Sequence, residues 1–199
     1  MQARYFIGSA LLVIALAGCT STGKSDSLLS SDQVIAMGVE AEKNGYEEQA
    51  KALSDGVVSA SEYRAAYDLV SACVAGKGYL VSDPVVNPLT STTYEFTYDS
   101  NGRDQDSAID DYQKCEDRYW GDVALAYGSN APQSIEPQLK EAIVQCMKVA
   151  SVNISAADVT TLKDLVGEND GSREQAARDC SLSETQRLYP DMPSVTISY

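Results

Sequence analysis

Apolar residues recur at helical spacing along most of the chain, which predicts a mainly helical protein. Ser30 to Gln33 fits a capping box, in which a serine and the residue three positions later bond each other's backbone, and the helix that it opens should end at Asn44-Gly45. A short helix from Tyr46 to Leu53 is expected next. The chain therefore begins its folded part with two consecutive helices.

A second capping box, Ser59 to Glu62, opens a helix whose apolar stripe contains Cys73. After this helix the apolar residues no longer recur at helical spacing. Residues 79–81 and 94–98 read as strands, and the prolines and polar residues between them exclude a helix there. We predict a small antiparallel hairpin with a long loop.

An acidic turn, Asp99 to Asp106, precedes one long helix. The apolar face of this helix holds Ile109, Tyr112, Cys115, Tyr119, Val123 and Tyr127. Residues 128–133 end the helix and form the natural internal boundary.

Beyond the boundary, one helix carries Cys146, a second begins at Ser155 and continues through Val166, and a last helix opens at Ser172. The tail Val195 to Tyr199 alternates as a strand does and should add to the hairpin.

We therefore expect an α+β fold that is mainly α, with a small antiparallel β-hairpin. The expected organisation is a signal peptide (1–18), a flexible tether (19–30), a helical domain with the hairpin (31–130) and a C-terminal helical segment (131–199). Each half shows a helix ending near a cysteine, an excursion, and a second cysteine on a later helix. This pattern fits either a duplication or merely two disulfide-joined helix pairs.

The leader ends in Leu16-Ala17-Gly18-Cys19 after one basic residue and an apolar run of some thirteen residues. It resembles the lipobox of bacterial lipoproteins, which implies diacylglycerol on Cys19 and removal of residues 1–18. As a helix, such a run spans about 20 Å against a hydrocarbon core of about 30 Å, too short for a transmembrane anchor. A plain signal peptide cut near Ala17 is the alternative.

Removing Cys19 leaves four cysteines, an even number that favours disulfides in an exported chain. Three connectivities are possible. We favour the connectivity with two local bridges, Cys73–Cys115 and Cys146–Cys180, because each bridge joins the ends of one apparent substructure.

Residues 53–132 carry the pattern L-x-D-G-x-V-S-x-x-E-Y, then Cys73 followed by Gly78-Tyr79, then YEFTY and a helix with Cys115. This arrangement resembles secreted and lipid-anchored proteins of actinobacteria, a group without an assigned activity. The resemblance supports the Cys73–Cys115 pairing and an address in the cell envelope. It implies no catalytic or ligand residue.

The chain has 29 acidic and 15 basic residues and no histidine, for a net charge of −14. Such a surface repels phosphate backbones, so nucleic acid is not expected as a partner. The missing histidine excludes Ser-His-Asp and Cys-His catalysis and histidine-bound zinc. Paired carboxylates such as Glu116 and Asp117, or Glu40 and Glu42, leave a carboxylate-dependent hydrolase as the remaining enzymatic alternative.

Asp55 to Glu62 matches the second half of an EF-hand loop, so Asp55 and Glu62 are weak metal candidates. Lys51 and Leu53 would occupy the first and third ligand positions, and neither offers an anionic oxygen. A glycine turn before a capped helix explains the same residues, and we expect no bound metal and no cofactor. A second acidic cluster, residues 99–111, is interpreted as a solvated turn.

Twelve tyrosines accompany two phenylalanines. Five of them fall on predicted buried stripes and are interpreted as core residues: Tyr63, Tyr67, Tyr112, Tyr119 and Tyr127. Trp120 lies off the stripe and is the candidate contact residue. The expected function is a lipid-anchored, non-catalytic protein on the extracytoplasmic face of the cell membrane that binds a protein or cell-wall component. The alternatives are an acidic surface spacer and a carboxylate-dependent hydrolase of wall polymer.

Overall fold

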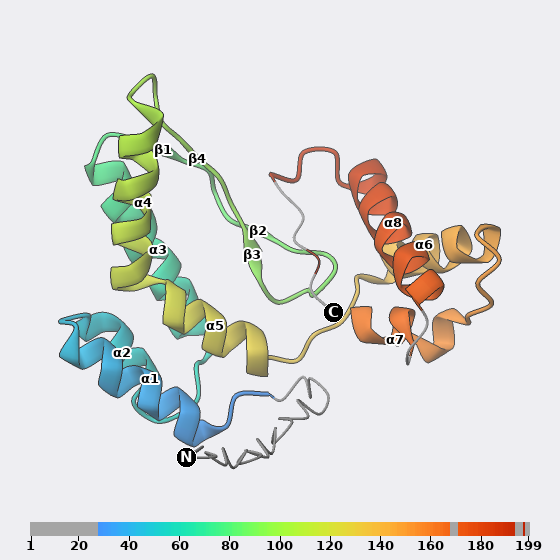
Figure 1. Cartoon of the computed structure of the whole chain (residues 1–199), viewed down its shortest axis with the longest axis horizontal. Helices are drawn as coiled ribbons and strands as arrows, with labels where there is room; N and C mark the ends of the chain where they lie inside the picture. The colour runs from blue at the N-terminus through green and yellow to red at the C-terminus, as the bar shows by residue number, and fades with distance from the viewer. Residues whose placement is uncertain (1–27, 168–170, 194–196, 198–199) are drawn as a thin grey trace, which may run out of the picture.

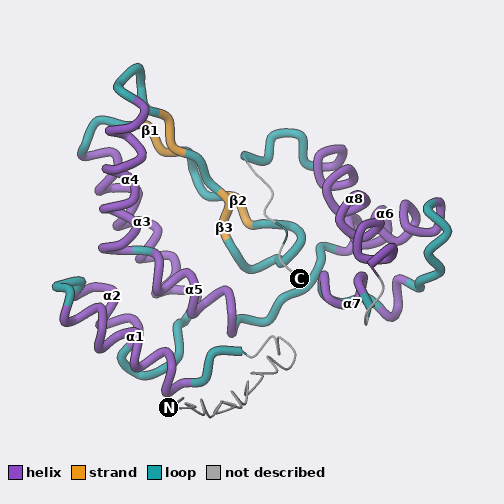
Figure 2. Tube along the Cα trace, in the orientation of Figure 1, coloured by secondary structure: helices purple, strands orange, loops and turns teal. Residues whose placement is uncertain are grey.

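The computed structural model describes residues 28–167, 171–193 and 197, and it is mainly helical (Figures 1 and 2). The predicted signal peptide, the lipidation site Cys19 and most of the tether lie outside the described residues. The predicted tail strand does too, apart from Ile197. Along the described ranges, no helix is both long and apolar enough to cross a membrane.

The first two helices, α1 (Ser31–Lys43) and α2 (Glu47–Leu53), pack against each other, and α3 (Ala60–Gly76) follows them. Both predicted capping boxes are confirmed. Ser30 and Ser59 accept the backbone N–H of the residue three positions on, and that residue's side chain bonds the cap backbone in return.

The predicted antiparallel hairpin is confirmed, and a second pair of strands extends it into a longer two-stranded ribbon with a shorter loop than expected. β1 (Leu80–Val81) pairs with β4 (Tyr98–Asp99), and β2 (Val85–Val86) pairs with β3 (Tyr94–Glu95), both antiparallel. The prolines next to β2 hid this strand from the sequence reading, but a two-residue strand fits between them. The loop is thereby reduced to residues 87–93, which we call the ribbon tip.

The predicted long helix is broken, and that prediction was wrong. α4 (Gln105–Tyr119) ends at Trp120, whose φ of −127° leaves helical geometry, and α5 (Gly121–Asn130) begins beside it. Gln49 from α2 is buried at the break. Its Nε2 donates to the Asp117 carbonyl (2.7 Å), and its Oε1 accepts the amide of Asp122 (2.9 Å) and that of Val123 (3.2 Å). A side chain far away in sequence thus satisfies backbone groups that the break leaves without helical partners.

The helices and the ribbon enclose a first core rich in aromatic rings. The Tyr63 ring lies 4.2 Å from that of Tyr127, 4.7 Å from Trp120 and 4.8 Å from Tyr94, measured between centroids. The Tyr63 hydroxyl accepts the Tyr94 amide at 2.9 Å, and burial raises the pKa of Tyr63 to about 12. The tyrosine-rich composition therefore supplies this core.

The second half contains α6 (Pro137–Val149), the 3-10 helix η1 (Ala156–Asp158), α7 (Leu162–Val166) and α8 (Gly171–Leu188). Ser155 begins only η1, not a helix that continues to Val166. The reason is a stronger start further on, where Thr161 and Asp164 form a capping box for α7.

Both predicted disulfides are confirmed. Cys73–Cys115 joins α3 to α4 and Cys146–Cys180 joins α6 to α8, with Cα atoms 5.8 and 5.7 Å apart. Each bridge links two packed helices. In the chain-entropy view, closing loops of this length stabilises a fold by about 4 kcal/mol each.

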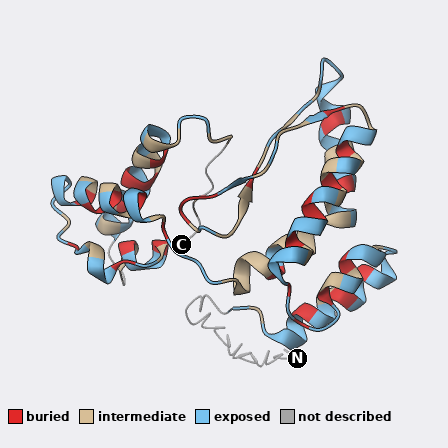
Figure 3. Ribbon diagram, turned by 180° about the vertical axis from the view of Figure 1, so that it is seen from behind, coloured by how far each residue is buried: buried red, intermediate tan, exposed pale blue. Residues whose placement is uncertain are grey.

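The buried apolar residues form two clusters, and we call residues 31–130 the N-terminal lobe and residues 131–193 the C-terminal lobe (Figure 3). One residue crosses this division. Leu89, on the ribbon tip, is 1% exposed and belongs to the second cluster. Figure 1 shows the ribbon running from the α4 end of the N-terminal lobe toward the C-terminal lobe.

Backbone hydrogen bonds hold the ribbon tip in place. The Ser134 amide donates to the Thr90 carbonyl (2.9 Å), and the Glu136 amide donates to the Pro88 carbonyl (2.8 Å). Within the tip, the buried Asn87 accepts the Leu89 amide at 2.8 Å and so fixes the turn that points Leu89 into the second core. The lobes are therefore joined by a packed contact as well as by the connecting chain.

Candidate functional site

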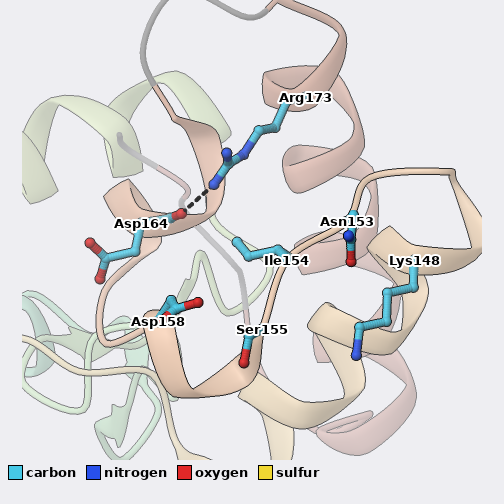
Figure 4. A pocket seen from close by; sticks show the side chains of 7 residues that line it. All are labelled: Lys148, Asn153, Ile154, Ser155, Asp158, Asp164 and Arg173. Atoms are coloured by element: carbon cyan, nitrogen blue, oxygen red, sulfur yellow. Dashed lines mark hydrogen bonds between the residues drawn. The ribbon is translucent and has the colours of Figure 1, made fainter.

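The C-terminal lobe contains an open polar cavity of about 540 Å³ (Figure 4). This volume lies within the range of small-molecule sites. Its walls come from the end of α6, the following loop, η1, α7 and the start of α8. The lining residues are Lys148, Asn153, Ile154, Ser155, Asp158, Asp164 and Arg173.

The loop after α6 forms one wall because the chain turns sharply there. Ser151 has a φ of +66°, and the Val152 amide bonds the Met147 carbonyl at 2.9 Å, which closes the helix end. Ile154 is buried and anchors the loop, so the neighbouring Asn153 and Ser155 stay exposed at the cavity. The Ser155 hydroxyl also accepts the Ala157 amide at 3.3 Å.

The opposite wall is fixed by two charged residues that bond to backbone. Asp164 accepts hydrogen bonds from the amides of Thr160 and Thr161, both at 2.8 Å. The bond from the Thr161 amide is the largest cause of a lowered pKa of the Asp164 carboxyl, and the bond from the Thr160 amide adds to it. Arg173 donates from Nε to the Leu165 carbonyl and from Nη2 to the Asp164 carbonyl, both at 2.7 Å, the second drawn in Figure 4. Arg173 thereby satisfies the free carbonyls at the end of α7.

Gly167 is required beneath this arginine. Its φ is +70°, and a Cβ there would lie 2.8 Å from the nearest guanidinium nitrogen of Arg173. The backbone after α7 can therefore pass directly under Arg173 only as glycine.

Two lining side chains, unlike those of Asp164 and Arg173, make no bond to the backbone of the described residues. Lys148 and Asp158 are exposed, and no hydrogen bond or ion pair joins either side chain to another of the described residues. They come from α6 and η1, ten positions apart in sequence. The cavity thus presents one cation and one carboxylate that remain available to a ligand.

A second, smaller cavity of about 120 Å³ lies between α2 and α3, beside Tyr119. Half of its lining residues are alanine or leucine, and the others are Glu48, Lys51, Glu62 and Tyr119. Its size accommodates one small apolar side chain, and it brings together fewer polar groups than the cavity of the C-terminal lobe.

Trp120 does not serve as an exposed contact residue in this structure, which corrects the prediction. It is 6% exposed, and its ring packs against Tyr63, Tyr67 and Phe96 in the first core. The error has a physical cause. On a continuous helix Trp120 would lie at the edge of the predicted stripe, where spacing along the chain does not decide burial, and the packing of Trp120 against the rings of the first core decides it.

The weak metal candidates Asp55 and Glu62 are occupied by local bonds. Asp55 Oδ1 accepts the Val57 amide at 3.0 Å, and Glu62 Oε2 accepts the Ser59 amide at 2.8 Å. These are the bonds of a turn and a helix cap. Across the part of the chain that the structure describes, no three acidic or cysteine side chains gather as a metal site would require.

The acidic cluster at residues 99–111 is likewise tied to nearby groups. Asp104 caps α4 through the Ser107 amide at 2.9 Å, which lowers the pKa of Asp104. Asp111 accepts Lys77 Nζ and the Tyr79 hydroxyl, each at 2.9 Å, and these bonds lower its pKa.

Of the acids considered for hydrolysis, Glu40 and Glu42 lie on α1, and Glu116 and Asp117 lie on α4. Glu40 pairs with Lys43 at 3.0 Å on the exposed side of α1. Burial, with the nearby charge of Asp117, raises the pKa of Glu116, and the same two causes raise that of Asp122. The Asp117 side chain accepts Gln113 Nε2 at 2.8 Å along α4.

Sequence reasoning missed the cavity of the C-terminal lobe entirely. Apart from Ile154, its lining residues are ordinary polar types, and they are spread over 26 positions with no spacing that matches a known ligand set. The segment between the helix with Cys146 and the helix with Cys180 contains these polar residues, but its pattern predicted a capped helix from Ser155 to Val166.

Fold and site together define a class: a mainly helical, disulfide-braced protein with two cores and an open polar cavity in the smaller lobe. Comparison of the chain with protein-family models, with curated proteins and with solved structures finds no match.

Proposed function

We propose that the protein is a lipid-anchored protein of the cell envelope that binds a wall component or a protein through the cavity of its C-terminal lobe, without catalysing a reaction. The observation that carries the binding role is the pair Lys148 and Asp158, two charged side chains at one cavity that make no bond to another described residue. A surface spacer would require no such cavity.

The extracytoplasmic address is supported by the leader and by the cysteines. The sequence Leu16 to Cys19 resembles a lipobox, and the four remaining cysteines form disulfides, which persist in oxidising compartments. The resemblance of residues 53–132 to lipid-anchored actinobacterial proteins supports the same address.

The mass of the intact protein extracted from membranes, with and without reductant, tests the address. We expect residues 1–18 to be absent, an acyl adduct on Cys19, and a gain of four protons on reduction. An unmodified full-length chain would overturn the localisation.

Binding is tested by adding solubilised wall fragments to the isotope-labelled mature protein and following its amide resonances by NMR. We expect shifts at residues 148, 153–158 and 164, and loss of these shifts in the double variant Lys148→Gln/Asp158→Asn. The matched control is Lys140→Gln/Glu141→Gln, because it makes the same charge changes on α6 away from the cavity.

Shifts confined to the N-terminal lobe, or shifts unchanged in the cavity variant, would refute binding at this cavity. Cleavage of the wall fragments during the titration would favour the hydrolase alternative. A protein that changes neither the fragments nor its own spectrum would favour the spacer.

A further inference from the structure

Charges of both signs line the cavity of the C-terminal lobe, in a chain of net charge −14. Among the described residues, the lining has two cations, Lys148 and Arg173, and two carboxylates, Asp158 and Asp164, so the formal charge of this described lining is zero. A purely anionic ligand would meet two carboxylates, and a purely cationic ligand would meet two cations. The lining therefore favours a ligand that carries both signs.

The four charges are not equivalent. Arg173 and Asp164 are bonded to backbone at the two ends of α7 and hold the wall in shape. Lys148 and Asp158 lack any such bond to the described residues, so a ligand can contact them without breaking the fold. In the view of Figure 4, the Ser155 hydroxyl lies between these two side chains.

The neutral part of the lining narrows the ligand class. Asn153 and Ser155 offer amide and hydroxyl groups that can bond a peptide group, and none of the lining residues that the structure describes is aromatic. A sugar ring would lack the aromatic face on which sugars commonly stack. An amide-containing ligand with separated charges fits these groups better.

We propose that this cavity binds a short peptide with free ends, its carboxylate on Lys148 and its ammonium group on Asp158, with Asn153 and Ser155 bonding the amide between them. This inference deepens the proposed function and rests on it. Because Lys148 and Asp158 are exposed, each contact should contribute about fivefold in affinity or less, and the binding should weaken as salt rises.

The experiment titrates the full mature protein with L-alanyl-L-alanine by isothermal calorimetry at low salt. Three blocked forms accompany it: the N-acetyl peptide, the C-terminal amide, and the peptide blocked at both ends. We expect the free peptide to bind most tightly and each block to weaken binding about fivefold.

Two single variants assign the contacts. Asp158→Asn should weaken the free peptide to the level of the acetylated one and leave the acetylated peptide unchanged. Lys148→Gln should weaken the free peptide to the level of the C-terminal amide and leave the binding of the C-terminal amide unchanged. The control Lys140→Gln/Glu141→Gln should bind all four peptides as the wild type does, and circular dichroism checks that each variant is folded.

Equal affinities for all four peptides would overturn the assignment. So would variants that lose affinity for the acetylated peptide and for the C-terminal amide to the same extent. If no peptide binds while wall fragments still shift the cavity resonances, the peptide inference is wrong and the proposed function stands. If neither binds there, both are wrong.

Discussion

The two lobes use the same bracing but different interiors. Each joins two packed helices by a disulfide, yet the N-terminal core is built around stacked tyrosines and Trp120, whereas the C-terminal core is aliphatic. Charge divides them as well. Residues 31–130 hold 18 acidic and seven basic residues, a net of −11, and residues 131–199 hold ten and six, a net of −4.

This difference teaches where a cavity can form. Aromatic side chains each bury a large area and fill the space between the N-terminal helices and the ribbon. The C-terminal lobe connects α6 to α8 through short helical pieces and irregular backbone, whose polar side chains cannot enter an aliphatic core and so line an open cavity.

The largest expected effect comes from removing a disulfide from one lobe at a time. Cys146→Ser/Cys180→Ser should lower the free energy of unfolding of the C-terminal lobe by about 4 kcal/mol, and the smaller lobe should lose its hydrogen-exchange protection. Cys73→Ser/Cys115→Ser should act similarly on the N-terminal lobe. Hydrogen exchange measures each lobe, and the fluorescence of Trp120 reports the N-terminal one.

If the Cys146→Ser/Cys180→Ser variant unfolded both lobes in one transition, the description as two separate cores would be wrong.

Leu89 gives the next largest effect and tests the contact between lobes. Leu89→Ala should cost about 3 kcal/mol, because it leaves a cavity around a side chain that is 1% exposed. The loss should appear in the amide exchange of the C-terminal lobe, although residue 89 belongs to the N-terminal one. Leu80→Ala is the control, since Leu80 is 58% exposed and should change stability by less than about 0.5 kcal/mol.

A loss confined to the amides of the N-terminal lobe would contradict the placement of Leu89 in the second core.

Gln49 tests the helix break that distinguishes the N-terminal lobe. Gln49→Ala should cost about 2 kcal/mol, because the Asp117 carbonyl and the Asp122 and Val123 amides lose their partner. Urea unfolding gives the stability, and hydrogen exchange should accelerate most at residues 122 and 123. Gln113→Ala, on the exposed side of α4, should be close to neutral. If hydrogen exchange at residues 122 and 123 did not change in Gln49→Ala, Gln49 would not be the residue that stabilises the helix break.

The smallest effect separates the lobes by pH. Burial raises the pKa of Glu116 in the N-terminal lobe, so its contribution to stability is present below the ordinary pKa of a glutamate and is lost as pH rises through the folded value. Bonds from the Leu139 and Thr161 amides lower the pKa of Glu136 and Asp164 in the C-terminal lobe. Their contribution is present above the ordinary pKa and is lost as pH falls.

Glu116→Gln should therefore stabilise the N-terminal lobe at pH 7 by less than about 1 kcal/mol and have little effect near pH 4. Acid should weaken both lobes, because Asp104 and Asp111 in the N-terminal lobe also have a lowered pKa, whereas the raised pKa of Glu116 belongs to the N-terminal lobe. Urea unfolding between pH 4 and pH 8 measures both effects, with Glu47→Gln on α2 as the control for removal of one charge. A Glu116→Gln variant that is less stable at pH 7 would argue against the burial effect.

Local patterns in the sequence predicted much of the fold because their causes are local. Capping boxes at Ser30 and Ser59, helical stripes and turn residues each depend on neighbours within one helical turn. The two disulfides followed from the even cysteine count and the spacing of helices. The break at Trp120 could not be read in this way, because its stabilising partner, Gln49, lies about seventy positions away.

The sequence by itself determined most of the helices, their caps and the acidic surface, since these depend on short-range bonding and on composition. It favoured the local pairing of the cysteines, and the packing of α3 against α4 and of α6 against α8 fixed that pairing. Only the tertiary structure decided that Trp120 is buried, that Leu89 belongs to the other core, and that Lys148 and Asp158 share a cavity. The physical reason is that burial and electrostatic contact depend on distance in space, and packing sets that distance independently of separation along the chain.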